Sequence, residues 1–371
     1  MTPREEQPSV KPRFPASSLL GISPNDVRIG PVLAIPAVLS ELGVTPQRAF
    51  AAARIDPGLF EDPDGRISFS ELGRLLETCI ALTQVHHFGL LVGERFELHA
   101  LGPLGYLMPN SATVGDALRS LSLHLHLHDR GAAPILMSPA TGSTMLGYSV
   151  YRHDTPALAQ IYDTAIAIGY RIMAQLCGPS WKPLRVQFSY SPPENAAPHR
   201  ELFGSRVVFD AEVSGIVFSS RWLEKPVEGA DPLLHGIVDR AIRAAETSNP
   251  MVFSEQVKAV LPQMVLSGSV SANAVASLFG VSERTLRRRL EDQDTNLQQL
   301  LNEARFELAQ QLLGNTGLTV SQIAAALRYA DPNIFSRAFR NWAGLSPTQW
   351  RAEIQSSEDA PAEGRDRRPD D

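Results

Sequence analysis

The spacing of hydrophobic residues changes along this chain and divides it into regions of different character. From Phe253 onward, apolar residues recur every three or four positions, which is the period of an amphipathic α-helix. Between Val32 and Leu223, helical patterns are mixed with short segments rich in β-branched and aromatic residues. Residues 1–30 and 356–371 show no sustained period. The pattern therefore predicts two folded regions between two disordered tails.

The first folded region, residues 31–225, combines helices with short strands. Helices are expected at Ser68–Leu82, Thr113–His126 and Pro156–Cys177. Gly, Pro or Ser residues bound four expected strands, which are Thr144–Tyr151, Leu184–Tyr190, Arg206–Phe209 and Gly215–Phe218. This mixture predicts an α+β domain. Residues 226–250, with three early turn residues and a helical Leu233–Glu246, are expected to form a connector.

The second folded region, residues 251–355, carries a run of helix start and stop signals and is expected to be all-α. Ser282, Thr319, Asp331 and Ser346 are expected N-caps, and the segments after Thr319 and Ser346 also have the spacing of a capping box. Pro332 and Pro347 stand at first helical positions. A long helix is expected from about Asn296 to Leu313, ended by Gly314 and Gly317.

Two segments of this region have the spacing of a helix-turn-helix. Such a unit needs a small residue where its helices cross, a turn residue that tolerates positive φ, and an apolar inner face on its second helix. Ala276, Gly280 and Leu286 meet these needs, and a similar set lies about 48 residues later at Ala324, Arg328 and Phe335. The intervening helix of about 18 residues spans ~27 Å. That length is close to the ~34 Å between successive major grooves on one face of DNA.

These segments resemble the DNA-binding domain of the bacterial AraC/XylS-type transcription regulators. The resemblance covers residues of about 251–353. It rests on Val275–Leu290 (VASLFGVSERTLRRRL), Glu303–Leu313 (EARFELAQQLL), Ile323-Ala, Tyr329, Phe335–Arg340 (FSRAFR), Trp342–Pro347 (WAGLSP) and Trp350-Arg351. A single helix-turn-helix match is a weak signal, whereas two at this spacing followed by the closing Gly-x-Ser-Pro segment are specific.

The resemblance implies that the outer faces of the two recognition helices contact double-stranded DNA. Carried over by position, the contact residues are Arg284, Arg287, Arg288, Asn333, Ile334 and Arg337. Arginine suits this role because its planar fork can bond a guanine edge twice or clamp a phosphate. The alternative for each arginine is a solvated charge on an exposed helix face. Arg289 and Arg305 are expected to contact phosphate or their own domain. Phe335, Phe339, Trp342 and Trp350 are expected in the core.

The second unit departs from the family pattern at two positions. Arg328 stands where the family usually has a turn glycine, and Asn333 where it usually has serine. An arginine at positive φ costs ~1 kcal/mol or more. Arg328 could instead keep a helical conformation or contact a phosphate.

The charge distribution is compatible with DNA binding once the chain is divided. The net charge is −6 overall, but it is −4 over residues 1–250, +1 over 251–355 and −3 over 356–371. Ser282–Leu290 alone holds four arginines and one glutamate. A DNA phosphate interacts with the charge of the nearby segment rather than with the net charge of the whole chain.

The first folded region resembles, less sharply, the effector domain of the ornithine-responsive subgroup of the same family. The matching segments are Phe88–Phe96 (FGLLVGERF), Leu101–Tyr106 (LGPLGY), Thr113–Leu118 (TVGDAL), Pro198–Gly204 (PHRELFG) and Val208–Asp210 (VFD). The resemblance implies that this region senses a small molecule and contributes to a homodimer. An activator of this kind would also contact RNA polymerase.

Other candidate sites have ordinary structural explanations. His124, His126 and His128 alternate with leucines, but no carboxylate or cysteine in the sequence completes a metal site, so a partly buried polar helix end is expected. Asp62-Pro-Asp-Gly65 lacks the later ligands of a calcium loop and is expected to be a turn. Cys79 and Cys177 lie in apolar helical patterns and are expected to be buried. The sequence thus predicts neither a metal nor a cofactor.

The sequence therefore favours a ligand-responsive, sequence-specific transcription regulator over two alternatives. A DNA-repair enzyme with the same DNA-binding module would need a cysteine-rich zinc site, which two scattered cysteines do not supply. A purely architectural DNA binder has no need of a mixed domain of about 190 residues. No phosphate loop or nucleophile elbow is present, and no apolar run spans a bilayer, so a cytoplasmic protein that is not an enzyme is expected.

Overall fold

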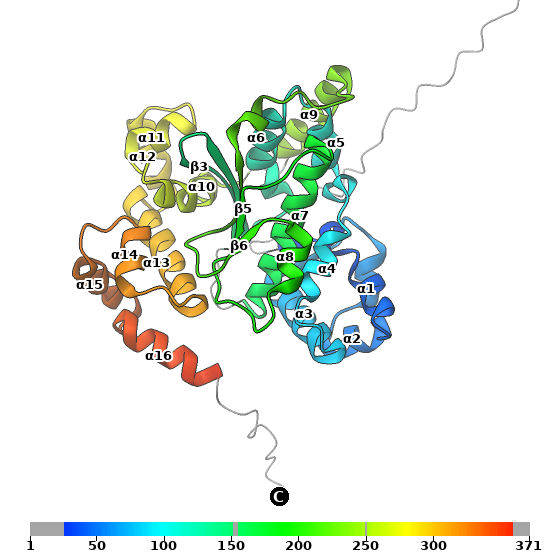
Figure 1. Cartoon of the computed structure of the whole chain (residues 1–371). Coiled ribbons are helices and arrows are strands. Elements are labelled where there is room, and N and C mark those ends of the chain that lie inside the picture. The colour runs from blue at the N-terminus through cyan, green and yellow to red at the C-terminus, as the bar shows by residue number, and fades with distance from the viewer. Residues whose placement is uncertain (1–25, 151–154, 249–250, 359–371) are drawn as a thin grey trace, which may run out of the picture.

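The computed structural model describes residues 26–150, 155–248 and 251–358. A mixed α/β body is followed by an all-helical body, as Figure 1 shows from blue-green to yellow-red. This architecture confirms the predicted fold class. The two expected disordered tails lie almost entirely outside the described residues.

Short helices and a two-stranded ribbon form the N-terminal part of the first body. The ribbon pairs β1 (Asp26–Arg28) with β2 (Arg66–Ser68) in antiparallel fashion. The helices are α1 (Ile35–Glu41), α2 (Pro46–Ala53), α3 (Phe69–Thr83), α4 (Phe88–Glu94), α5 (Pro103–Leu107), α6 (Val114–His124), α7 (Leu158–Cys177) and α8 (Ala197–Phe203). The predicted helices correspond to α3, α6 and α7. Ser68 forms a capping box with Glu71, which fixes the start of α3.

A five-stranded sheet with the order β3-β4-β7-β5-β6 separates the two bodies. Its strands are β3 (Ala132–Ala140), β4 (Ser143–Val150), β5 (Arg185–Gln187), β6 (Arg206–Val208) and β7 (Ser214–Ser219). All neighbouring pairs are antiparallel except β5 and β6. The sequence patterns predicted four of these strands and missed β3, which contains Pro134 and Pro139. Proline is compatible with a strand at the edge of a sheet, where β3 lies.

Helix α7 is the central helix of the first body. It packs against α4 on one side and against β4 and β7 on the other. Cys79 and Cys177 are free and buried in the surrounding core, as expected. Burial raises the pKa of Cys79 to about 12 and that of Cys177 to about 11, so both thiols stay protonated.

The expected connector is packed against the first body. Its helix α9 (Pro232–Ser248) lies beside α5. Val238 and Ile242 of α9 are fully buried in the core of that body. The second body begins with α10 at Phe253.

The second body contains seven helices among the described residues. They are α10 (Phe253–Ser267), α11 (Ala272–Leu278), α12 (Glu283–Glu291), α13 (Leu297–Asn315), α14 (Val320–Ala326), α15 (Pro332–Ala343) and α16 (Pro347–Glu358). The predicted caps are present, with one correction. Helix α13 continues through Gly314 to Asn315, so Gly314 does not end it. Thr316 instead takes an extended conformation and stops the helix.

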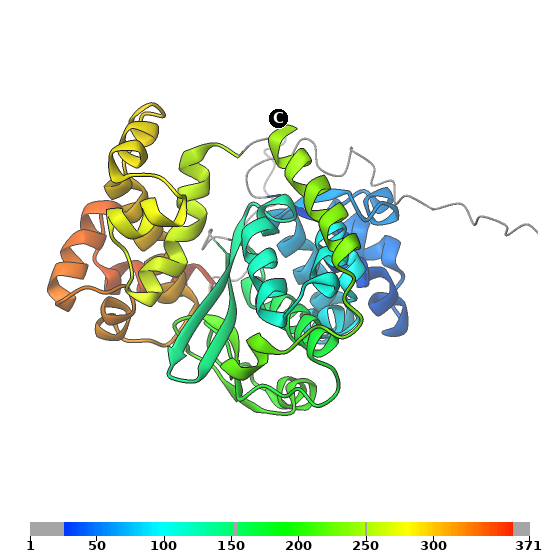
Figure 2. The ribbon, with the colours of Figure 1, turned by 90° about the horizontal axis from the view of Figure 1, so that it is seen from above.

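The two bodies share a hydrophobic contact across the sheet. Ile135, Met145 and Val217 point to the face that meets α10, and they join one buried cluster with Val257 and Leu261 of that helix. Their neighbours in the strands point to the opposite face, because side chains alternate along a strand. Figure 2 shows the β3–β4 hairpin between the helical body and the N-terminal helices.

Among the described residues, no single helix has both the length and the hydrophobicity to cross a bilayer. Helices α3 and α4 pass that test only as a pair, and they meet at a bend of 110°.

Candidate DNA interface and effector cavity

The first helix-turn-helix is formed by α11 and α12. Ser271 and Ser282 cap the two helices by accepting hydrogen bonds from Ala274 N at 3.0 Å and Thr285 N at 3.2 Å. Gly280 in the turn has a φ of 63°, a conformation that favours glycine. The predicted crossing residue Ala276 is buried. The structure therefore confirms the turn glycine and the crossing alanine that the sequence predicted for this unit.

Helix α12 buries one face and exposes the other. Leu286 and Leu290 are buried, whereas the predicted DNA-contacting residues Arg284, Arg287 and Arg288 are all exposed. Arg287 Nε donates to Glu291 Oε1 at 2.8 Å one turn further along. This surface ion pair raises the pKa of Arg287, which is cationic in any case. The exposed face of α12 is thus strongly basic.

The second helix-turn-helix is formed by α14 and α15. Thr319 and Gln322 form the predicted capping box at the start of α14. Arg328 in the turn has a φ of 60°, so it adopts the left-handed conformation rather than a helical one. Its guanidinium Nη2 donates to the carbonyl oxygen of Leu266 at 2.6 Å. Leu266 lies near the end of α10, so this arginine ties the second turn to the first helix of the body.

Helix α15 carries the second set of predicted DNA-contacting residues. Asp331 caps it by accepting from Asn333 N at 2.6 Å. Asn333, Ile334 and Arg337 are exposed on its outer face, and Ile334 is 44% exposed despite its apolar side chain. Phe335 on the inner face is fully buried. The structure thus places both predicted sets on exposed surfaces.

Aromatic side chains fill the core around α15. Phe339 lies 5.5 Å from Phe306, 5.9 Å from Phe335 and 5.8 Å from Trp350, measured between ring centroids. Trp342 and Trp350 are only partly buried, and both pack against this core. All four aromatic residues assigned to the core by the sequence therefore contribute to it.

Arg289 and Arg305 contact their own domain. The Arg289 guanidinium lies 5.2 Å from the centroid of the Phe253 ring. The Arg305 guanidinium lies 5.0 Å from the centroid of the Tyr329 ring. Both distances are within the range of a cation–π interaction. Of the two alternatives that the sequence left open for these residues, the structure shows the intradomain one.

The first body contains a cavity between α3, α6, α7 and the sheet. Its volume is about 100 Å³, counted as the space open to the centre of a water-sized sphere. Leu146 and Ile216 line it from the strands, on the face opposite to the one that meets α10. Sequence patterns did not predict this cavity, because its wall is assembled from segments far apart in the chain.

A buried polar cluster lies at one end of the cavity. Asp129 Oδ1 accepts from Gly131 N at 2.8 Å and from Ala132 N at 3.0 Å, and Tyr148 donates its hydroxyl to Asp129 Oδ2. Burial raises the pKa of Asp129 to about 7, against the opposing effect of these hydrogen bonds. His128 is also buried, and burial together with the nearby Arg28 and Arg66 lowers its pKa well below the usual range. His128 is therefore uncharged at neutral pH.

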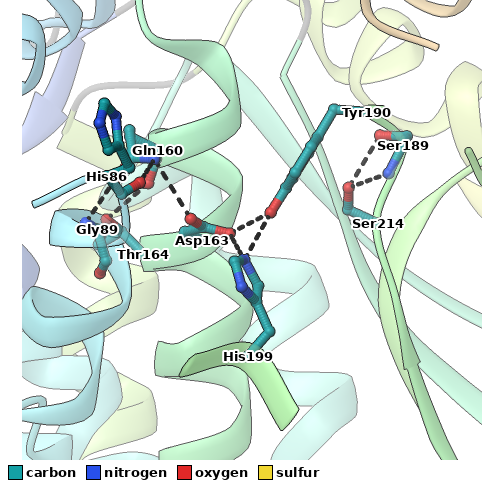
Figure 3. Close-up of polar contacts among 9 residues, drawn as sticks. All are labelled: His86, Gly89, Gln160, Asp163, Thr164, Ser189, Tyr190, His199 and Ser214. Carbon is teal, nitrogen blue, oxygen red and sulfur yellow. Dashed lines mark hydrogen bonds and ion pairs between the residues drawn. The ribbon is translucent and has the colours of Figure 1, made fainter. Parts of the chain in front are cut away.

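A second buried polar network joins α7 to the sheet and α8 (Figure 3). Tyr190 donates its hydroxyl to Asp163 Oδ1. His199 Nε2 lies 3.0 Å from that carboxylate oxygen and 3.0 Å from the Tyr190 hydroxyl. Gln160 joins the network through its Nε2 atom, which lies 3.4 Å from Asp163 Oδ2. The sequence did not predict this network, since its members lie on separate elements.

The network reaches the second body through the residue after Tyr190. Ser191 N donates to the carbonyl oxygen of Asn315, at the end of α13, at 2.8 Å. Close by, Gly317 N donates to Asp210 Oδ1 at 2.7 Å. A third hydrogen bond joins Gln263 Nε2 of α10 to the carbonyl oxygen of Leu136 at 2.9 Å. The two bodies are thus connected at both α10 and α13.

The histidine-rich segment needs one correction. The structure does bring a carboxylate to it, because Glu246 Oε1 of α9 lies 2.7 Å from His124 Nδ1 and 3.4 Å from His126 Nε2. The sequence could not show this, since Glu246 is 122 residues from His124. Within the described parts of the chain, no group of three His, Cys, Asp or Glu side chains is arranged to hold a metal ion. Asp62–Gly65 forms the expected turn, and Arg28 forms an ion pair with Asp64.

Comparison with known proteins covers both bodies. Residues 43–227 match the family model for the arabinose-binding domain of AraC transcription regulators, and residues 275–353 match a helix-turn-helix domain. The ornithine utilization regulator of Pseudomonas aeruginosa is 30% identical over 327 residues, which cover 85% of this chain and 93% of that protein. The regulator VirS of Mycobacterium tuberculosis is 28% identical over 316 residues, with the same two coverages.

A solved structure also aligns with most of the chain. It is the transcriptional regulator CdpR from Pseudomonas aeruginosa, which is 23% identical and covers 83% of this chain and 96% of its own, with a TM-score of 0.41. The curated relatives are named as transcription regulators rather than enzymes. The chain therefore belongs to the AraC-type transcription regulators and consists of an N-terminal effector-binding domain and a C-terminal helix-turn-helix DNA-binding domain.

Proposed function

We propose that one chain reads two adjacent major grooves of DNA, with α12 in the first and α15 in the second. Arg284, Arg287 and Arg288 contact bases or phosphates from α12. Asn333, Ile334 and Arg337 do so from α15. Two features support this proposal: both outer faces are exposed, and the 19-residue α13 between them spans ~28 Å. That length suits a separation of one helical turn of DNA.

The effector acts, in this proposal, through the sheet that joins the two domains. The observation that supports this is that the side chains of adjacent strand residues point to opposite faces of the sheet. Leu146 and Ile216 line the cavity, whereas Met145 and Val217 contact the core of the DNA-binding domain. These strands can take alternative positions relative to the helices. A small molecule that binds more tightly to one of these arrangements therefore also shifts the placement of the DNA-binding domain.

The remaining assignments follow from the family membership. The domain layout that we propose is 31–225 for effector sensing and dimerisation, 226–250 for the connector and 251–355 for DNA binding. A homodimer would place four reading helices on one DNA site, and an activator would contact RNA polymerase. The relative from P. aeruginosa is named for ornithine utilization, and we propose that this chain likewise responds to a small molecule. Its place of action is the cytoplasm.

Selection of DNA from a random library by the full-length protein tests the reading of two grooves. The enriched sites should contain two conserved blocks whose centres lie about one helical turn apart. Affinity should fall steeply with salt, because arginine contacts displace counterions from phosphate. A single conserved block, or binding that salt does not weaken, would contradict the proposal.

A matched pair of variants tests the coupling through the sheet. Ile135→Ala removes a buried contact with the DNA-binding domain, whereas Ile237→Ala removes an exposed isoleucine of α9. Only Ile135→Ala should shift the dissociation constant for the selected DNA site, by about threefold or more, although neither residue lies on the DNA-contacting helices. Equal dissociation constants for the two variants would show that docking and DNA binding are independent.

A further inference from the structure

The cavity of the N-terminal domain has a distinctive chemistry. Nearly all of the described side chains that line it are hydrocarbon, and among them only Thr164, His128, Asp129 and Tyr148 carry polar groups. Its volume of about 100 Å³ is several times the ~10–15 Å³ needed to admit one water molecule. Helix α7 forms one wall with a stripe of residues at helical spacing, Ile161, Ala165, Ile168, Gly169 and Ile172.

Because of the cavity, the middle of the central helix α7 has accessible surface. Ala165, Ile168 and Gly169 are partly exposed, although α7 packs between α4 and the sheet. A Cβ atom at Gly169 would lie 3.4 Å from Ile216 Cδ1, an ordinary van der Waals contact, so the glycine leaves space that the fold does not require. An accessible apolar cavity of this kind attracts apolar ligands more readily than water.

Most of the polar groups in the wall already have partners. Thr164 Oγ1 lies 3.1 Å from Gly89 O and 2.9 Å from Gln160 O. Asp129 accepts three hydrogen bonds from the protein, one of them from Tyr148. A polyhydroxylated sugar would therefore leave most of its hydroxyl groups unpaired in the cavity, at a cost of ~1–3 kcal/mol for each group. A free amino acid would bury its charges among hydrocarbon side chains.

His128 is the exception among these residues. It is 5% exposed, lines the cavity, and its Nδ1 atom has no hydrogen-bond partner in the described part of the chain. A neutral imidazole offers one donor and one acceptor nitrogen, so it can pair with one hydroxyl or carbonyl group. Arg28 and Arg66 lie close to His128, so a cationic ligand would meet like charges. Asp129 lies beside His128 and, in its ionised form, disfavours an anionic ligand.

We propose that this cavity binds an uncharged, mainly hydrocarbon molecule with a single hydrogen-bonding group, which pairs with His128, and that this molecule is the effector. The proposal rests on the proposed coupling through the sheet for its regulatory part. The ligand class itself rests only on the cavity.

Binding of N-phenylnaphthylamine to the full-length protein tests the ligand class, because the fluorescence of this uncharged probe rises in apolar sites. The wild-type chain should show saturable binding. Gly169→Leu fills the cavity and should weaken binding by about tenfold or more. Gly236→Leu, at a glycine on α9 where a Cβ would meet only Arg240 Nη1 at 3.5 Å, should bind like the wild type. If Gly169→Leu does not fold, Gly169→Ala provides the milder change, with an expected loss of about two- to threefold.

Competition against the probe tests the role of His128. Naphthol should displace the probe at concentrations about fivefold lower than naphthalene does, because only naphthol can bond to the imidazole. His128→Leu should abolish that difference and leave naphthalene unaffected. Arabinose and ornithine should not compete.

The outcomes separate the ligand class from the proposed function. Absence of saturable binding, equal binding by Gly169→Leu, or displacement by arabinose or ornithine would overturn the ligand class, while DNA binding measured in parallel would still stand. Saturable binding that Gly169→Leu weakens supports the ligand class. If that binding leaves the affinity for the selected DNA site unchanged, the effector role is overturned and the coupling through the sheet fails with it.

Discussion

The two helix-turn-helix units of this protein have the same geometry and differ in how they are built. Both have a buried alanine at the helix crossing and a left-handed turn residue, with φ values of 63° at Gly280 and 60° at Arg328. The recognition helix of the first unit has three arginines among its proposed contact residues, and it packs through buried leucines, Leu286 and Leu290. The recognition helix of the second unit has one arginine among its proposed contact residues, it packs on a cluster of aromatic rings, and its turn is tied to α10.

This difference indicates that the two units contribute differently to DNA affinity and to stability. Three of the four arginines proposed to contact DNA lie in the first unit, so it should contribute most to affinity. The second unit buries larger side chains, so it should contribute more to stability. A turn residue other than glycine is tolerated in the second unit because its side chain forms a contact that glycine cannot form.

The largest expected effect comes from the buried residues at equivalent positions of the two recognition helices. Phe335→Ala should destabilise the protein by ~3–5 kcal/mol, because it leaves a cavity in the aromatic core. Leu286→Ala should cost less, within ~2–5 kcal/mol, since a smaller side chain is removed. Urea denaturation of the full-length chain measures both. A smaller loss for Phe335→Ala than for Leu286→Ala would reverse the assignment of stability to the second unit.

The next effect concerns the arginines of the first unit. Arg284→Ala should relax base preference in one half of the DNA site by ~1–3 kcal/mol if the contact is bidentate to guanine. Arg287→Ala should act on the same half, and Arg337→Ala on the other half alone. Binding titrations on sites mutated in each half measure these effects. An equal loss on every DNA sequence would reassign these arginines to phosphate contacts.

Substitutions in the two turns separate backbone strain from side-chain contacts. Both variants lose the bond to the Leu266 carbonyl, but Arg328→Ala keeps a Cβ at a left-handed position, whereas Arg328→Gly removes the Cβ and relieves the strain. The glycine variant should therefore be more stable than the alanine variant by ~1 kcal/mol. Gly280→Ala should cost a similar ~1 kcal/mol in the first turn. Thermal melting of the full-length variants measures the differences, and equal melting temperatures for the two Arg328 variants would show that strain at this turn is negligible.

The smallest effect is expected at the exposed isoleucine of the second recognition helix. Ile334→Ala should leave the melting temperature nearly unchanged, because the side chain is 44% exposed. It should weaken binding to sites with thymine in the second half by less than about 1 kcal/mol, since it removes an apolar contact with the thymine methyl group. Ser336→Ala on the same helix, where the hydroxyl donates only to Pro332 O at 2.8 Å, provides the control. A clear fall in the melting temperature of Ile334→Ala would instead assign this residue to the fold.

Local signals made the DNA-binding domain predictable. Capping residues such as Ser282 and Thr319 act within one turn of their own helix, so their effect can be read from adjacent residues. A positive φ at the second turn was one of the alternatives that the sequence left open, and the structure shows that Arg328 adopts it, whereas the partner of Arg328 was not predicted. Leu266 is 62 residues away and reaches the turn only after α10 has packed.

The N-terminal domain was predictable to a lesser degree. Helices α3, α6 and α7 follow from hydrophobic period, because a buried helix face repeats at a fixed interval. Strand β3 was missed, since its prolines are acceptable only at a sheet edge and edge position is a property of the whole sheet. The sequence also did not predict that the Glu246 carboxylate lies near His124, because the two residues are far apart in the chain.

The sequence by itself determined the family, the helical units and the residues exposed on the two recognition helices, because periodicity, caps and motif spacing are local properties of the chain. Only the tertiary structure decided which residues enclose the cavity and which face of the sheet carries the DNA-binding domain. Leu146 and Met145 are adjacent and similar in hydrophobicity, yet one lines the cavity and the other contacts the neighbouring domain. Strand alternation assigns them to opposite faces, but what covers each face depends on how distant helices pack.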